Sequence, residues 1–121
     1  MSSSDSIVYL YDGNSIVGMV YTSEIGTTAT YYFHRNLLGD VIGIYDVLGN
    51  KVAGYAYDAW GNCLVIDPAT GLATDDFEFI GNQNPFRYRG YYWDNDLQLY
   101  YLMSRYYDPQ TGRFINADNI S

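Results

Sequence analysis

Cysteine and histidine are almost absent from this sequence of 121 residues, and each scarcity excludes a class of site. Cys63 is the single cysteine, so it cannot form an internal disulfide, and no histidine lies near it in the sequence to activate it as a nucleophile. His34 is the single histidine, and no cysteines or carboxylates surround it with zinc-ligand spacing. We therefore expect neither a metal site nor a bound cofactor.

Positive charge is also scarce. Six Lys and Arg residues stand against fourteen Asp and Glu residues, which gives a formal net charge of −8. Nucleic-acid binding needs clustered cations, because the phosphate backbone repels an acidic surface, so we expect no nucleic-acid partner. No apolar run approaches the roughly 20 residues of a membrane-spanning helix. The polar residues 1–5 lack the basic and apolar regions of a signal peptide, so none is expected.

Tyrosine and glycine, in contrast, are abundant. The chain holds 15 tyrosines and 12 glycines, and 48% of its residues are hydrophobic. Tyrosine suits a half-buried pleated surface, because its ring covers apolar area while its hydroxyl reaches water or a polar partner. Glycine suits tight turns between strands. This composition favours a single all-β domain covering residues 1–121, with a modest core.

A short repeat supports this interpretation. Tyr-Asp-x-x-Gly-Asn occurs at residues 45–50 and again at 57–62, an offset of 12 (58 − 46) between the two aspartates. Weaker copies lie at 11–14 and at 107–112. An aspartate can start a turn by accepting backbone N–H groups, and glycine can adopt the left-handed conformation that returns the chain. The predicted turn residues are Asp46, Gly49, Asp58, Gly61, Asp108 and Gly112.

The repeats predict an antiparallel meander of hairpins. Residues 67–85 are the least regular segment, and we expect a long loop there. The strands are expected near residues 6–12, 15–22, 29–34, 40–46, 51–57, 62–66, 86–92, 98–106 and 113–116.

Longer motifs carry a family resemblance. NPFRYRG at 84–90 and LQLYYLMSRYYDPQTGRFINAD at 97–118 resemble the repeat-associated core of Rhs proteins, and the Tyr-Asp repeats resemble YD repeats. The YYFHRNLLGDV segment at 31–41 is similar to an aromatic-His element of that family, in which His34 would be a hydrogen-bonded structural residue. The resemblance covers about residues 30–118, and it leaves 1–29 as a divergent N-terminal hairpin.

In Rhs, toxin-complex and polymorphic-toxin proteins, such repeats build a β-shell around a C-terminal toxin, and the core acts as an aspartyl autoprotease. The resemblance maps one catalytic aspartate onto Asp118, whereas the second, in an Asp-Pro-x-Gly-Leu motif, has no counterpart in this sequence. Asn119 also replaces a proline of the family pattern. A carboxylate dyad needs both members, so Asp118 alone predicts a shell module without enzymatic activity. The resemblance further implies a secreted or cell-surface location.

Two alternatives stay open. The tyrosines could form a carbohydrate-binding face, although cross-strand packing accounts for the same residues. The chain could also self-assemble into homo-oligomers or filaments, or pair with neighbouring Rhs repeats, because outer strands present unpaired backbone groups. The tyrosine-rich run at 98–107 carries few charges and no proline that would oppose such pairing.

Overall fold

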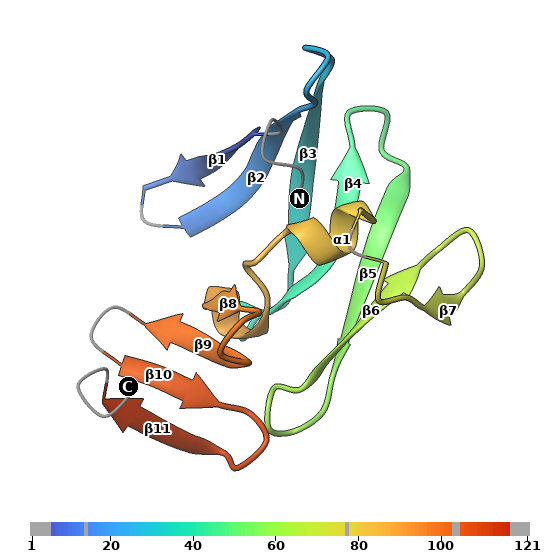
Figure 1. Ribbon diagram of the computed structural model, residues 1–121. Coiled ribbons are helices and arrows are strands. Elements are labelled where there is room, and N and C mark those ends of the chain that lie inside the picture. The colour runs from blue at the N-terminus through green and yellow to red at the C-terminus, as the bar shows by residue number, and fades with distance from the viewer. Residues whose placement is uncertain (1–5, 14, 77, 103–104, 117–121) are drawn as a thin grey trace.

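The chain folds into two antiparallel sheets, each of them a meander (Figure 1). The computed structural model describes residues 6–13, 15–76, 78–102 and 105–116. The seven strands of the first sheet are paired in chain order and are β1 (Ser6–Asp12), β2 (Ser15–Thr22), β3 (Thr28–Arg35), β4 (Val41–Asp46), β5 (Lys51–Tyr57), β6 (Cys63–Asp67) and β7 (Leu72–Ala73).

The second sheet contains the last four strands in the order β11-β10-β9-β8. They are β8 (Tyr92–Asp94), β9 (Leu99–Leu102), β10 (Arg105–Asp108) and β11 (Arg113–Asn116). A short helix, α1 (Ile80–Gln83), and a 3-10 helix, η1 (Tyr88–Gly90), connect the two sheets. The all-β prediction is therefore confirmed. Within the described residues, neither helix has the length and apolar character needed to cross a membrane.

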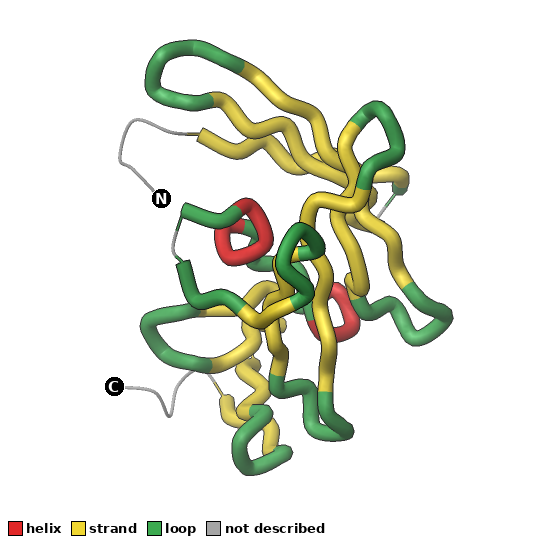
Figure 2. Tube along the Cα trace, turned by 90° about the vertical axis from the view of Figure 1, so that its right-hand side faces the viewer, coloured by secondary structure: helices red, strands yellow, loops and turns green. Residues whose placement is uncertain are grey.

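The core lies on the face of the first sheet that α1 covers (Figure 2). Its buried residues come from β2 and from β4 to β6, and include Met19, Ile44 and Val65. Gly81 of α1 lies directly against this face, because a Cβ built there would stand only 2.7 Å from a Val65 methyl. The Tyr55 hydroxyl fixes the helix by donating to the Gly81 carbonyl at 2.5 Å.

Three of the predicted element assignments are wrong. Residues 86–92 are not a strand, because Arg89 adopts a left-handed φ of 54° and the chain coils into η1 before β8 begins. The predicted strand 98–106 is instead the hairpin of β9 and β10, whose strands pair antiparallel. The predicted loop 67–85 contains β7 and α1. Residues 67–71 nevertheless form a turn whose Asp67 accepts the Ala69 N–H.

Candidate functional site

The two sheets meet where two turns of the repeat type lie against each other (Figure 1). One is turn 58–62, between β5 and β6. The other is turn 108–112, between β10 and β11. We call the contact between these two turns the seam. At the seam, residues that are far apart in the sequence are joined by hydrogen bonds and ring contacts.

Turn 58–62 is built on its aspartate. One oxygen of Asp58 accepts the backbone N–H groups of Trp60 at 2.8 Å and Asn62 at 3.0 Å. Its other oxygen accepts the Asn62 side-chain amide at 2.8 Å. These hydrogen bonds, led by that of the Asn62 side chain, lower the pKa of the Asp58 carboxyl. Gly61 closes the turn at a φ of 97°.

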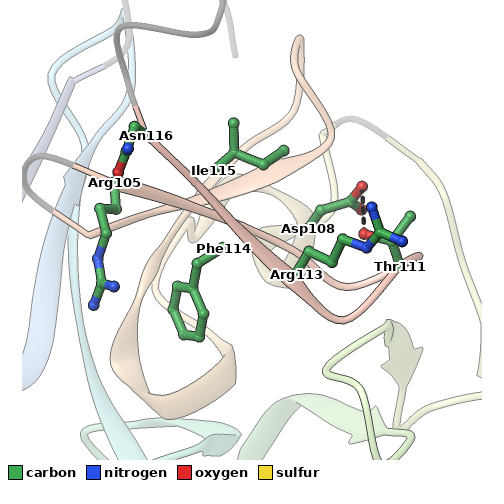
Figure 3. Close-up of a pocket in the computed structure, with 7 residues that line it drawn as sticks. All are labelled: Arg105, Asp108, Thr111, Arg113, Phe114, Ile115 and Asn116. Carbon is green, nitrogen blue, oxygen red and sulfur yellow. Dashed lines mark hydrogen bonds between the residues drawn. The ribbon is translucent and has the colours of Figure 1, made fainter.

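Turn 108–112 is built in the same way, with one more residue between its aspartate and its glycine. Asp108 accepts the Gln110 N–H at 2.9 Å and the Thr111 hydroxyl at 3.1 Å (Figure 3). Gly112 returns the chain at a φ of 69°. Hydrogen bonds within the turn therefore hold its shape, and Pro109 and Gly112 face the first sheet.

Three hydrogen bonds join turn 58–62 to the second sheet and its turn 108–112. The Tyr107 hydroxyl donates to the Trp60 carbonyl at 2.5 Å, and the Tyr100 hydroxyl donates to the Gly61 carbonyl at 2.9 Å. In the opposite direction, the Asn62 amide donates to the Pro109 carbonyl at 3.0 Å. The Trp60 ring lies directly on Gly112, where an added Cβ would stand 2.3 Å from the ring. Only glycine allows this approach without a shift of the ring.

A tyrosine cluster backs the seam. The Tyr88 ring from η1 lies at its centre, with ring centroids within about 6 Å at Tyr57, Tyr91, Tyr100 and Tyr107. Burial raises the pKa of the Tyr57 and Tyr100 hydroxyls, so both stay neutral well into the alkaline range. These rings contact one another across strands. A carbohydrate-binding face, which needs exposed rings, stays a prediction.

Arg87 lies buried between the sheets. Its guanidinium donates to the carbonyls of Asn84 at 3.0 Å and Asn82 at 3.3 Å, and it lies over the Tyr55 ring at 5.7 Å. Nearby Cys63 is largely buried, which raises the pKa of its thiol to about 11. A thiol that stays protonated at neutral pH is a poor nucleophile.

Asp40 links the first sheet to η1, a contact that the sequence interpretation missed. Its buried carboxylate accepts the Arg89 N–H at 2.7 Å and the Asn36 amide at 3.0 Å, which fastens η1 to the β3–β4 turn. The signal was present in the sequence. Residues 36–40, Asn-Leu-Leu-Gly-Asp, have the spacing of the Tyr-Asp repeats with asparagine in place of aspartate.

A hollow of about 490 Å³ lies along β10 and β11 (Figure 3). Asp108 is the one acidic residue among the described residues that line it, and the Arg105 guanidinium lies 4.7 Å from the centre of the Phe114 ring. Asp118, the predicted half of a protease dyad, lies outside the described residues. The His34 and Tyr45 rings form an edge-to-face pair, with 6.1 Å between their centroids. In the described part of the chain, no group of three or more His, Cys, Asp or Glu residues is arranged to hold a metal.

No family model matches the chain. A tRNA(Glu)-specific nuclease WapA of Bacillus subtilis subsp. natto is 36% identical over 130 residues, which cover 91% of this chain and 5% of the nuclease. Double-stranded DNA deaminase toxin A of Burkholderia cenocepacia is 32% identical over 106 residues, 88% of this chain and 7% of the toxin. The chain belongs to the Rhs polymorphic-toxin family.

The fold of this Rhs segment agrees with that assignment. A crystal structure of TcdB2-TccC3-TEV superposes with a TM-score of 0.68 at 22% identity, covering 95% of this chain and 5% of the larger one. At this identity the likeness concerns the fold alone. The family resemblance read from the sequence motifs is confirmed, and the segment is a toxin-associated Rhs module.

The prediction of a protein without enzymatic activity is wrong. The relatives of this Rhs segment carry enzymatic names, tRNA nuclease for the WapA proteins and DNA deaminase for the Burkholderia toxin. The prediction relied on the missing partner of Asp118, which concerns proteolysis and has no bearing on nuclease or deaminase chemistry. The segment spans 5% to 7% of the length of these relatives.

Proposed function

We propose that this Rhs segment is a piece of shell wall in a longer toxin that carries an enzymatic activity. The wall encloses the toxic part of the polypeptide and keeps it away from solvent and proteases. The observation that carries the proposal is a pair of matches over nearly the whole segment. One match, covering 91% of the segment, is to a nuclease, and the other, covering 95%, is to the fold of TcdB2-TccC3-TEV.

The architecture suits a wall. Both sheets are meanders, so successive hairpins add area without crossing connections. The two sheets are fastened at the seam by buried rings and hydrogen bonds, which gives a stiff joint between neighbouring parts of the wall. β1 and β11 each pair on one side only within the described residues, so each can accept a strand from an adjacent repeat.

The edge at β8 differs from the other edges. Its outer side is occupied by the chain itself, because Trp93 donates its N–H to the Pro85 carbonyl at 2.7 Å and Phe86 bridges to Tyr92. Pairing with neighbouring repeats should therefore use β1 and β11 rather than β8. We also propose a secreted or cell-surface location for the whole toxin, in line with the role of its relatives as toxins.

A chimaera tests the wall function. The 130 residues of Bacillus subtilis tRNA nuclease WapA that match the segment would be replaced by this chain. If the segment builds wall, the chimaera should fold, and the toxic part should resist limited proteolysis as in the parent. A matched chimaera with Gly112→Trp, which removes the room for the Trp60 ring at the seam, should expose the toxic part.

Two results would contradict the proposal. One is equal protease resistance of the toxic part when the segment is deleted outright. The other is equal resistance when the seam is broken, because a wall must be intact to protect its contents. Intact-mass analysis of the digests identifies which part of the polypeptide is cut.

A further inference from the structure

Three turns of the first sheet share one hydrogen-bond scheme. They are turns 36–40, 46–50 and 58–62. In each, the side-chain oxygen of the first residue accepts the N–H groups of the third and fifth residues, at distances from 2.8 to 3.0 Å. The fourth residue is a glycine with a φ between 86° and 97°. The three turns are therefore copies of one structural unit.

One of these copies is docked. Turn 58–62 uses three groups to hold turn 108–112. The side chain of its third residue, Trp60, lies on Gly112. The carbonyl of the same residue accepts the Tyr107 hydroxyl. The amide of its fifth residue, Asn62, donates to the Pro109 carbonyl.

Turn 46–50 offers groups at the same three positions, and none of them has a partner outside its own turn among the described residues. Its third residue is Leu48, which is 82% exposed, and the Leu48 carbonyl accepts no hydrogen bond there. Its fifth residue is Asn50, whose amide makes only a 3.4 Å contact within its own turn, to Asp46. The set of docking groups is therefore complete, and no other element of the described chain holds it.

Turn 36–40 does not offer the set. Its third residue, Leu38, is exposed, but its fifth residue is Asp40, which has no amide to donate. That carboxylate is also buried and occupied by the Arg89 N–H. The comparison between copies therefore selects turn 46–50 alone.

The position of turn 46–50 in the fold also supports its role as a docking site. The meander places turn 46–50 at the end of the first sheet opposite to turn 58–62, away from the second sheet (Figure 1). The chain's own turn 108–112 is already held by turn 58–62. The partner for turn 46–50 must therefore come from a different polypeptide segment.

We propose that turn 46–50 is a docking site for a β-hairpin whose turn reads Tyr-Asp-Pro-x-x-Gly. The hairpin's tyrosine hydroxyl donates to the Leu48 carbonyl, and its proline carbonyl accepts the Asn50 amide. The Leu48 side chain lies on the hairpin's glycine, as Trp60 lies on Gly112. The proposal rests on turn geometry and does not depend on the role of the segment in a toxin.

The experiment uses the full chain and a cyclised peptide with the sequence RYYDPQTGRFIN, residues 105–116. The backbone amides of the isotope-labelled chain are followed by NMR as peptide is added. We expect saturable shifts centred on Leu48, Gly49 and Asn50. A peptide with phenylalanine in place of the tyrosine before the aspartate should bind about fivefold more weakly, as the loss of one hydrogen bond implies.

Matched variants locate the site. Asn50→Ala removes the amide but keeps the backbone of the turn, and should weaken binding severalfold. Leu38→Ala, in the turn that lacks the set, should leave binding unchanged. The proposal is overturned by an absence of shifts at millimolar peptide, by shifts confined to residues 58–62, or by equal binding to the Asn50→Ala chain.

Discussion

The hydroxyl of Tyr107 donates a hydrogen bond to the carbonyl of Trp60 at 2.5 Å, across 47 positions of sequence. Both residues belong to copies of the Tyr-Asp repeat. In the copy at 57–62, the turn supplies Trp60 and Asn62. In the copy at 107–112, the end of β10 supplies the Tyr107 hydroxyl, and the turn supplies Pro109 and Gly112. The same short motif therefore forms the hairpins and joins one sheet to the other.

Removing the Tyr107 hydroxyl tests whether its hydrogen bond stabilises the contact between the two sheets. Tyr107→Phe keeps the ring within the cluster around Tyr88 but leaves the Trp60 carbonyl without its donor. We expect the free energy of unfolding to fall by about 1 kcal/mol, the usual net value of one hydrogen bond. Urea unfolding measures it.

Tyr106→Phe is the matched control for that variant. Tyr106 neighbours Tyr107 on β10, and its ring contacts Tyr101, but its hydroxyl makes no hydrogen bond among the described residues. Its loss should change stability by a few tenths of a kcal/mol at most. Equal effects of the two variants would show that the hydroxyl of Tyr107 does not tie the sheets together.

Variants at two glycines distinguish the cost of backbone strain from the cost of a steric clash. Gly49 and Gly61 occupy the same place in turns 46–50 and 58–62, with φ of 86° and 97°. A Cβ at Gly49 would meet nothing within 4 Å, whereas at Gly61 it would stand 2.7 Å from the Tyr88 ring. We expect Gly49→Ala to cost about 1–2 kcal/mol from φ alone, and Gly61→Ala to cost clearly more. Thermal unfolding of the two variants compares them, and equal losses would contradict the packing at Gly61.

Local sequence signals predicted most of the first sheet but not the seam. Alternation and Asp-x-x-Gly spacing act over a few residues, so the bounds of β1, β2 and β5 were predicted correctly. The prediction of a strand at 86–92 was wrong because tertiary contacts override the local strand propensity there. The Asp40 carboxylate, 49 positions away, holds the Arg89 N–H while Arg89 is left-handed. No local pattern shows that Trp60 lies on Gly112, because that contact depends on how the two sheets pack.

The stability of the chain should fall at alkaline pH, because several buried thiol and hydroxyl groups have a higher pKa in the folded state than in the unfolded state. Burial raises the pKa of Cys63 from 9.0 to about 11 and that of Tyr9 from 10.0 to about 12, and it also raises those of Tyr57 and Tyr100. The folded chain then binds more protons than the unfolded chain above pH 9, so the contribution of these groups to stability is constant below that pH and falls as pH rises. Urea midpoints measured across this range would show the decline.

Cys63→Ala isolates one part of that decline. Without the thiol, the loss of stability should begin near pH 10, where free tyrosines start to ionise, instead of near pH 9. The difference between the two chains should reach roughly 2 kcal/mol by pH 11, the value that a shift of this size implies. Identical pH profiles would mean that the thiol is not sequestered in the folded state.

The proposed wall depends on the pairing of edge strands with other strands. β1 forms one border of the first sheet, and Val8 on it is 61% exposed. Tyr32 is 49% exposed but lies on β3, where it pairs with Gly18 of β2 and Tyr45 of β4. We expect the chain to associate in added salt, which screens the repulsion of its net charge of −8. Val8→Lys should suppress that association, since a lysine on an edge strand opposes pairing, and Tyr32→Lys should not. Both variants change the net charge equally, so light scattering at matched salt separates edge pairing from general charge effects. Equal association of the two variants would exclude β1 as the pairing edge.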